Sequence, residues 1–463
     1  MNLEQLYLKL PVSLQNFGCS LEGLRIQQKR YGAGFRRRLE ESKLRGDWSR
    51  EEIFEFRDQR LRQFVAHCAT TVPYYRRKFK ELRIRSEDIR GLDDLRVLPI
   101  LKKQDVQDHP AEFVSELASQ YKCDPVHTSG TTGGGLNFLS TNEAIEEQWA
   151  TWWRFRNWHG LEFGTWCAYF GGRSLVPIEQ TCPPFWRTNY PGRQLFFSGY
   201  HLGPTNFESY AEKLRSAKIP WLHGYPSLLA LLAAYISDTG FDLGYQPRWI
   251  TVGAENLLPQ QAMLIERAFG VRAIQHYGLA EAVANISQCE HGSLHADEDF
   301  AAMEFIEDEP GRCRVVGTNF SNLATPLLRY DAQDIVWTGN LKCDCGKPGR
   351  LVESIDGRQE DYVVLRNGTR LGRLDHIFKD MVHIREAQIV QHEVGAIELR
   401  IVRGPNYGGD EERQLRLEFT KRLGKDTDVQ ISYVSEIPRT SSGKLRFVIS
   451  EVEDHEPLRL SVK

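Results

Sequence analysis

The chain has 463 residues, of which 41% are hydrophobic and 26% are charged. At about 150 residues per domain this length predicts two or three domains, and the composition excludes a disordered, collagen-like or disulfide-scaffold chain. Its 59 Lys and Arg against 62 Asp and Glu leave a formal charge of −3, which does not indicate a nucleic-acid or membrane-surface partner. The function must therefore be inferred from local motifs.

Hydropathy and cysteine usage indicate a cytoplasmic protein. The longest apolar run, Leu228 to Ile236, is about half of the roughly 20 residues that a membrane-spanning helix needs. The first ten residues carry charges and lack the apolar core of a signal peptide. Nine dispersed cysteines, an odd number, are typical of a reducing compartment. We therefore expect no membrane span.

The predicted elements change in character along the chain. Residues 1–120 are expected to be helical, with basic faces such as Arg36 to Arg38 exposed to solvent. From Tyr121 short apolar runs alternate with helical patterns. Predicted strands at 221–223, 249–252 and 273–276 enclose helices that end at Gly240 and Gly270. This alternation predicts an α/β fold whose ligands bind beyond the carboxyl ends of parallel strands.

A second change in composition follows residue 357. Strand-like runs such as Tyr362 to Leu365 then alternate with charged helical stretches such as Gly409 to Leu423, which predicts a separate α+β domain. We therefore expect an N-terminal domain at 1–357 and a small C-terminal domain at 358–463. Within the first, 1–120 is the helical region and 121–357 carries the site.

The strongest local signal is the segment His127 to Gly135, which is rich in hydroxyls and glycines. Its backbone could approach an anion closely and donate hydrogen bonds to phosphate oxygens. It is not a Walker loop, because no lysine follows the glycines. The alternative is a plain surface turn. Ser140 and Glu143 have the spacing of a capping box and predict that a helix follows.

Five segments in order resemble the adenylate-forming superfamily, and within it the phenylacetate-CoA ligase-like and CapK-like members. They are the loop just described, Tyr277-Gly278-Leu279-Ala280-Glu281, the ribose-binding segment at 328–334, the hinge at 357–361 and the lysine motif at 438–444. The resemblance implies a large N-terminal domain with parallel-rich sheets and a small mobile C-terminal domain. It implies a ligase that converts a carboxylic acid and ATP into an acyl adenylate and pyrophosphate, and then transfers the acyl group to a thiol, coenzyme A.

Two alternatives remain beside that activity. The acceptor could be a carrier-protein thiol or an amine, or the chain could be a non-catalytic nucleotide-binding scaffold. The oligomeric state is open, with a homodimer as one option.

The resemblance also assigns roles to residues of this chain. The phosphate loop would comprise Thr128, Ser129, Gly130, Thr131, Thr132 and Gly133, with Thr132 in a catalytic role. Glu281 would bind Mg²⁺, which suits one carboxylate with phosphate oxygens and waters. The nucleotide would also contact Gly253, Ala254, Glu255, Tyr277, Gly278, Asp334 and Arg358. Lys444 would stabilise the charge that develops at the α-phosphate and carboxylate, and a rotation near Glu360 would then remove it.

The sequence departs from the family pattern at three places. Gly134-Gly135-Leu136 replaces a common proline and lysine, 329–334 lacks the usual Thr-Gly-Asp ending, and Gln359-Glu360-Asp361 replaces a common hinge aspartate. The first departure means that one contact of the phosphate loop with an anion could be missing or be supplied elsewhere. The third affects the hinge about which the small domain would rotate.

A second group of residues suits a metal. Thiolates and imidazole are ligands of tetrahedral zinc, and some relatives have a similar set at this place. The predicted structural Zn²⁺ ligands are Cys289, His295, Cys343 and Cys345, with His291 as the rival for His295. The alternative is a set of buried free thiols.

The acid pocket is predicted from residues that lie near strand ends or motifs: Phe138, Tyr169, Phe170, Arg173, His223 and Tyr225. Their aromatic content suits an aryl or compact apolar acid. The alternative for each is core packing, and Arg173 could pair with a second carboxylate of the substrate or with a surface acid.

Overall fold

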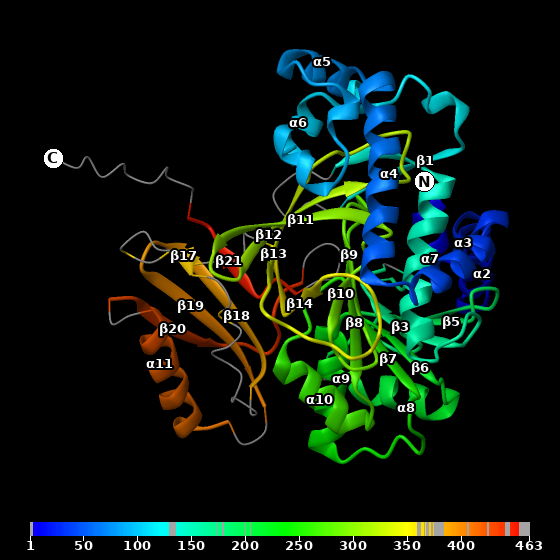
Figure 1. Ribbon diagram of the computed structural model, residues 1–463. Helices are drawn as coiled ribbons and strands as arrows, with labels where there is room; N and C mark the ends of the chain where they lie inside the picture. Colours follow the sequence, from blue (N-terminus) through cyan, green and yellow to red (C-terminus); the bar gives the residue numbers. More distant parts are fainter. Residues whose placement is uncertain are drawn as a thin grey trace.

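The computed structural model shows a large domain with a smaller domain at one side (Figure 1). It describes residues 3–128, 136–173, 175–177, 180–199, 201–203, 205–358, 363–364, 366, 370–371, 374, 384–404, 407–423, 426–439 and 445–452. Within these residues no helix combines the length and the apolar character that crossing a bilayer requires.

The chain begins with helices that cover the large domain. They are α1 (Leu3–Leu8), α2 (Val12–Arg30), α3 (Ala33–Arg45), α4 (Arg50–Thr71), α5 (Pro73–Leu82) and α6 (Lys103–Asp108), with the 3₁₀ turns η1 (Ser86–Asp88), η2 (Leu92–Val97), η3 (Pro110–Phe113) and η4 (Ala118–Gln120). Ser49 and Glu52 form a reciprocal capping box that begins α4. Of the expected basic face, Arg36 and Arg37 are exposed, whereas Arg38 is half-buried and ion-paired with Glu146.

The central sheet has nine strands in the order β14-β10-β9-β8-β7-β6-β3-β5-β4. Their bounds are β3 (Cys167–Gly171), β4 (Trp186–Asn189), β5 (Gln194–Ser198), β6 (Trp221–Gly224), β7 (Trp249–Val252), β8 (Ala273–Gly278), β9 (Asn285–Gln288), β10 (Leu294–Ala296) and β14 (Leu351–Val352). The five strands from β8 to β5 are parallel neighbours. The predicted α/β class and the three predicted strand positions are confirmed.

Helices cover both faces of this sheet. The helices α8 (Phe207–Ala217), α9 (Pro226–Thr239) and α10 (Pro259–Phe269) pack on one face, and α7 (Asn142–Trp158) packs on the other. Both α9 and α10 begin at a proline and end at a glycine with positive φ, as predicted. The expected capping box before α7 is wrong by one residue, because the Thr141 side chain is the cap and accepts from Ala144 N at 3.2 Å.

A second sheet closes the large domain. It contains β11 (Ala301–Glu309), β12 (Arg312–Asn319), β13 (Tyr330–Trp337) and β15 (Ser354–Arg358), all antiparallel. The hairpin of β1 (Cys123–His127) and β2 (Asn137–Thr141) directly precedes α7 in sequence, and its two strands flank the hydroxyl-rich loop.

The small domain has its own core. The strands β18 (Ile384–Glu393), β19 (Ala396–Arg403), β20 (Asp428–Tyr433) and β21 (Val448–Ser450) form a sheet that α11 (Gly409–Leu423) covers through Leu415 and Phe419. The short pair β16 (Val363–Val364) and β17 (Arg370–Leu371) precedes them. Hydrogen bonds between described residues join the domains: Gln260 Nε2 donates to Ile384 O at 3.1 Å, and Leu445 N donates to Glu255 Oε1 at 2.7 Å.

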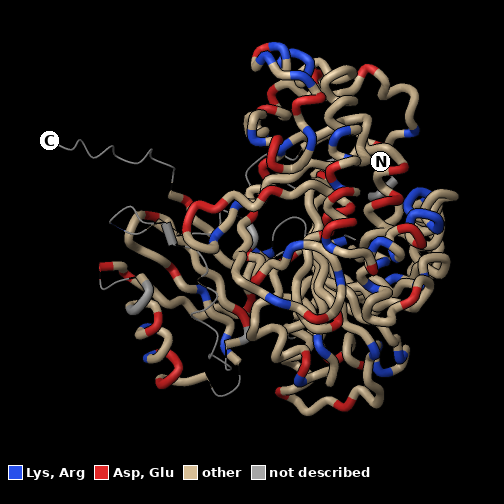
Figure 2. Tube along the Cα trace, viewed as in Figure 1, with Lys and Arg blue, Asp and Glu red and all other residues tan. Residues whose placement is uncertain are grey.

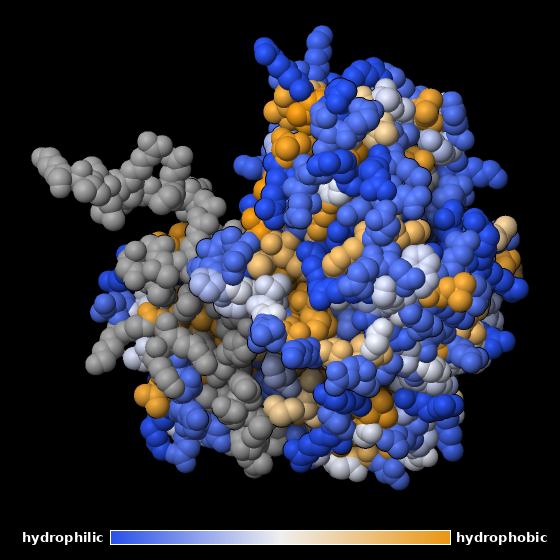
Figure 3. All heavy atoms as spheres, in the orientation of Figure 1, coloured by the Kyte–Doolittle hydropathy of each residue, from blue (hydrophilic) through white to orange (hydrophobic). Residues whose placement is uncertain are grey.

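Charges of both signs are interspersed along the trace and do not gather on one side (Figure 2). The visible surface is largely hydrophilic with small apolar areas (Figure 3). The functional site is therefore sought in the interior.

Candidate functional site

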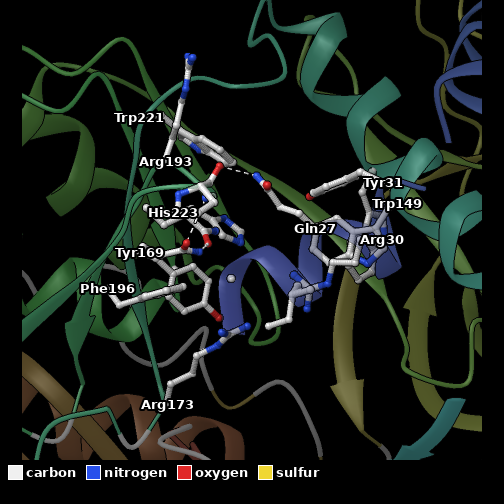
Figure 4. A pocket seen from close by; sticks show the side chains of 18 of the residues that line it. Gln27, Arg30, Tyr31, Trp149, Tyr169, Arg173, Arg193, Phe196, Trp221 and His223 are labelled. Atoms are coloured by element: carbon white, nitrogen blue, oxygen red, sulfur yellow. Dashed lines mark hydrogen bonds between the residues drawn. The ribbon is translucent and has the colours of Figure 1, made fainter. Parts of the chain in front are cut away.

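A cavity of about 1170 Å³ lies between α2, α7 and the central sheet. We call it the central cavity (Figure 4). Alternation along β3 and β6 explains which side chains reach it: Tyr169 and His223 point toward α7, whereas Phe170 and Leu222 point to the opposite face and pack under α8 and α9. The cavity therefore lies on one face of the parallel strands and reaches their carboxyl ends.

Most residues predicted for the acid pocket line the central cavity. Tyr169, Arg173, His223 and Tyr225 all do so. Phe138 does not line it but packs in a separate core cluster with residues such as Val283 and Phe320. Phe170 is likewise a core residue, with its ring stacked on Phe197 at 4.6 Å. These two phenylalanines therefore occupy core positions, which was the alternative to a place in the acid pocket.

Two neutral histidines face the central cavity. His223 Nδ1 lies 2.9 Å from Thr251 O, and burial together with the charge of Arg156 lowers the pKa of His223 to about 3. Burial also lowers the pKa of His276, and the charges of Arg156 and His223 lower it further. The buried Nδ1 of His276 makes no hydrogen bond to any described residue. Because both rings are uncharged at neutral pH, they provide polar atoms without adding positive charge.

The loop after β7 holds the predicted Gly253-Ala254-Glu255 segment. Gly253 and Ala254 line the central cavity, and Ala254 has the positive φ of +67° that places it in the left-handed region. Glu255 Oε2 accepts from Ser227 N at 3.3 Å, while its Oε1 accepts from Leu445 N. Burial raises the pKa of Glu255, and these hydrogen bonds oppose the rise. The segment thus joins the end of β7 to the small domain.

The predicted nucleotide residues on β8 and β13 meet directly. Tyr277 donates its hydroxyl to Asp334 Oδ2 at 2.6 Å, and Asp334 is buried. In the ladder between β13 and β15, Asp334 is paired with Arg358, whose side chain is outside the described part of the chain. Glu281 lies half-buried in the turn after β8. A hydroxyl and a buried carboxylate therefore meet near the end of β8, and a second carboxylate follows in the next turn of the chain.

Part of the predicted phosphate site falls outside the described residues: Ser129, Gly130, Thr131, Thr132 and Gly133 in the loop, and Lys444 in the small domain. Thr128 is described and buried, and its Oγ1 accepts from Leu136 N at 2.8 Å. This bond closes the base of the loop.

The structure brings the four predicted metal ligands together. The ligand atoms of Cys289, His295, Cys343 and Cys345 all lie within 4.8 Å of one another, from β10 and the turns beside β9 and β14. Cys289 Sγ and Cys343 Sγ are 3.7 Å apart, and Cys345 Sγ is 3.3 Å from His295 Nε2. Zinc at roughly 2.3 Å from sulfur and 2.0 Å from nitrogen would give tetrahedral edges of about 3.8 and 3.5 Å, which fit these separations. His291 is not part of the cluster.

The residues of α2 that line the central cavity were not predicted from the sequence. Arg30 lies over the Trp149 ring at 4.1 Å, and Tyr31 packs edge-on against the same ring. Arg156 of α7, also not predicted, lies among three tryptophans. The indole-rich segment of α7 is visible in the sequence, but nothing in it says that α2 folds across this face.

The chain is similar to known proteins along most of its length. Residues 365–451 match the family model of the CapK C-terminal domain. The chain is 25% identical to protein CapK of Staphylococcus aureus over 459 residues, which covers 97% of this chain and 100% of that protein. It is also 25% identical to the phenylacetate-coenzyme A ligase of Thermus thermophilus over 349 residues, covering 68% of this chain and 73% of the ligase.

Solved structures share the fold. A 2-hydroxyisobutyryl-CoA ligase in the postadenylation state, in complex with R3-HIB-AMP, aligns with a TM-score of 0.67 at 20% identity, covering 88% of this chain and 91% of that one. The same ligase in the thioesterification state gives a TM-score of 0.53 over the same coverage.

Proposed function

This chain is a homologue of CapK and of phenylacetate-CoA ligases and has the fold of adenylate-forming acyl-CoA ligases, and on that basis we propose that it activates a carboxylic acid with ATP. The acid displaces pyrophosphate to give an acyl adenylate, and the acyl group then passes to the thiol of coenzyme A. We place this reaction in the cytoplasm. The observation that carries the proposal is the hydrogen bond from Tyr277 to Asp334, on the strand β8 whose His276 and Gly278 line the central cavity together with Gly253 and Ala254.

The nucleotide would lie between these residues. A buried carboxylate such as Asp334 can accept both ribose hydroxyls, and Tyr277 holds it in place through one short hydrogen bond. The Tyr277 ring offers a face to the adenine, which the loop at Gly253 flanks. Glu281 would hold Mg²⁺, which when bound neutralises phosphate charge. The hydroxyl-rich loop that begins at Thr128 would donate to the β- and γ-phosphates.

Lys444 would supply the catalytic cation. Leu445, the next residue, donates its backbone N–H to Glu255. A lysine in this position could reach the α-phosphate and the acid, where two anions meet and negative charge increases in the transition state. The contact between Leu445 and Glu255 supports the assignment, because it joins the residue that follows Lys444 to the Gly253-Ala254-Glu255 segment.

Pyrophosphate release tests this function. Purified protein with ATP and Mg²⁺ is screened against aryl, aliphatic and dicarboxylic acids, and the products are identified by mass spectrometry before and after coenzyme A is added. We expect acid-dependent pyrophosphate that Lys444→Ala lowers at least a hundredfold, an effect of the size that one lost transition-state contact produces. Lys80→Ala, an exposed lysine of α5, is the matched control.

Two results would contradict the proposal. ATP binding without any acid-dependent pyrophosphate would favour a nucleotide-binding scaffold. If the acyl adenylate reacts with a carrier-protein thiol or an amine but not with coenzyme A, the adenylation step of the proposal stands and coenzyme A is wrong as the acceptor.

We also propose that Cys289, His295, Cys343 and Cys345 bind structural Zn²⁺. When bound, the ion would tie the turns beside β9, β10 and β14 together and stabilise this edge of the sheet. Elemental analysis should give about one zinc per chain, and Cys343→Ser should lose both the metal and several degrees of thermal stability. His291→Ala, which removes the neighbouring imidazole outside the cluster, should retain both. A metal-free wild-type protein of unchanged stability would instead identify four free side chains.

A further inference from the structure

The central cavity has an excess of positive charge. Four arginines line it, and among the described lining residues the single carboxylate is that of Glu22. Glu22 is already engaged by Arg25, with a distance of 2.8 Å between Arg25 Nη2 and Glu22 Oε1. The arginines are Arg30, Arg156, Arg173 and Arg193. Positive charge that the protein does not neutralise points to a ligand that does.

Arg156 is the most buried of these charges. Only 3% of its surface is exposed, and its Nε and Nη1 make no hydrogen bond among the described residues. Its guanidinium lies 4.9 Å from the Trp153 ring centre and 5.3 Å from that of Trp221. Aromatic faces compensate a cation only in part, so a guanidinium held in this way retains the capacity to bind an anion.

Arg30 and Arg173 are close to the same space. Arg173 lies over Phe196 at 5.0 Å and over Tyr169 at 5.7 Å, and Figure 4 shows these three side chains together at one end of the view. Burial lowers the pKa of Arg30 to about 10, and the charges of Arg173 and Arg156 contribute to this. All three arginines line the same cavity. None of them belongs to an ion pair within the described part of the chain.

The size of the cavity indicates a substrate larger than a compact acid. Pockets for drug-sized ligands hold about 300–1,000 Å³, and this one is about 1170 Å³. Its lining extends from Gly253 and Gly278, beside the nucleotide residues, to Cys19 and Gly23 of α2. The walls between these ends are largely indole, phenol and phenyl rings. Such walls suit an aromatic body.

We propose that the central cavity binds an aromatic carboxylic acid that carries a second anionic group, and that Arg30, Arg156 and Arg173 recognise this second group. The proposal rests on the proposed function in naming the carboxylate at the nucleotide end as the one that is activated. The substrate expected from the sequence was an aryl or compact acid, and the proposal restricts it to an aromatic acid with two negative charges. Recognition by charge-assisted hydrogen bonds would also reject acids of the same shape that lack the second charge.

Calorimetric titration of the full chain with matched acids tests the proposal. The dianionic probes are 4-carboxyphenylacetate and biphenyl-4,4′-dicarboxylate, and each is compared with the analogue whose second carboxylate is a carboxamide. We expect at least one dianion to bind ten- to a hundredfold more tightly than its amide, since hydrogen bonds to a charged group typically contribute that much.

Variants then locate the contact. Arg173→Gln and Arg30→Gln should each reduce the preference for the dianion to about threefold or less, with little effect on the affinity of the amide. Arg156→Gln should do the same if the protein folds, which a thermal melt checks. Arg37→Gln, an exposed arginine of α3 that pairs with Glu41 on the surface, should keep the full preference.

The outcomes separate this proposal from the proposed function. Equal affinities of dianions and amides, including no binding of either, would overturn it, as would a preference that survives all three substitutions. A rise in KM for coenzyme A in Arg173→Gln, with the preference unchanged, would assign the arginines to the thiol donor and also overturn it. A preference for the dianion without pyrophosphate release would support the recognition site and contradict the proposed function.

Discussion

Arg154 and Arg156 lie two residues apart on α7, and both are buried, with 2% and 3% of their surfaces exposed. Their surroundings differ completely. Arg154 donates from Nη2 to Asp297 Oδ1 at 2.6 Å and from Nη1 to Asp299 Oδ2 at 2.8 Å. Arg156 has tryptophan rings around it and the central cavity beside it, and two of its nitrogens make no hydrogen bond within the part of the chain that the structure describes.

The helix explains how one segment produces both environments. Two residues correspond to about 200° around an α-helix, so the side chains point in nearly opposite directions. Arg154 faces the sheet edge and the turn before β11, where Arg45 also reaches Asp299. Arg156 faces α2 and β6. One arginine of α7 is thus neutralised by buried aspartates, and the other lies beside the central cavity without an ion pair among the described residues.

The largest expected effect is on the paired side. Arg154→Met should lower the free energy of unfolding by about 3–5 kcal/mol, because it leaves the buried Asp297 and Asp299 without their cation. Denaturant unfolding at pH 7 measures this. Arg37→Met, on the surface, should change the value by less than about 0.5 kcal/mol. A small loss for Arg154→Met would mean that Arg45 alone neutralises the aspartates.

The penalty for Arg154→Met should also depend on pH. In the wild type, burial would raise the pKa of Asp299, but Arg154 and Arg45 hold it far below its usual range. The stability that Asp299 contributes is therefore present at neutral pH and is lost only as the pH falls through that low pKa. Without Arg154 the aspartates take up protons at higher pH, so acidification stabilises the variant relative to the wild type. The difference in free energy of unfolding between the wild type and Arg154→Met should decrease by about 2 kcal/mol between pH 7 and 5. A difference that does not change with pH would contradict this linkage.

The cavity side has its own pH signature in His223. Because burial and Arg156 hold the pKa of His223 near 3, the folded state keeps the ring neutral while the unfolded state protonates below about pH 6.5. Wild-type stability should therefore fall as the pH drops below 6.5, and His223→Gln should be free of that loss, a difference of about 1 kcal/mol at pH 5.5.

The exposed His392 is the control for this measurement. The side chains of Glu451 and Glu398 raise the pKa of His392, so its contribution is present at low pH and is lost as the pH rises. His392→Gln should change the stability profile with the opposite sign. Equal profiles for wild type and His223→Gln would show that the ring is hydrated and protonates in the folded state.

Much of the fold could be predicted from the sequence, because its local signals agree with its tertiary structure. Pro226 and Gly240 mark the two ends of α9, and Pro259 and Gly270 mark those of α10. The capping of α7 could not be predicted so well. Thr141 and Ser140 both suit a cap, and the pairing of β2 with β1 through Cys123 and Thr141 decides between them.

The residues of the candidate site likewise fall into those that the sequence could predict and those that it could not. Tyr277, Asp334 and Glu255 carry recognisable motifs, and the structure brings Tyr277 and Asp334 into contact. Arg30 and Arg156 belong to no motif. Whether an arginine is exposed, paired like Arg154 or unpaired like Arg156 depends on which helix packs against it, and that information lies in contacts between α2 and α7 that no local pattern records.

The smallest expected change in stability completes the comparison. Arg156→Met should alter the free energy of unfolding by less than about 1 kcal/mol, since the lost cation–π contacts are offset when an unpaired guanidinium no longer has to be buried. The same variant should lose the preference for a dianionic acid in calorimetry. If it instead loses as much stability as Arg154→Met, then the tryptophans around Arg156 hold it as a structural element and the cavity does not depend on its charge. If Arg156→Met is stable but no longer prefers the dianionic acid, and Arg154→Met is unstable, then the two arginines of α7 have different roles: Arg154 stabilises the fold and Arg156 binds the ligand.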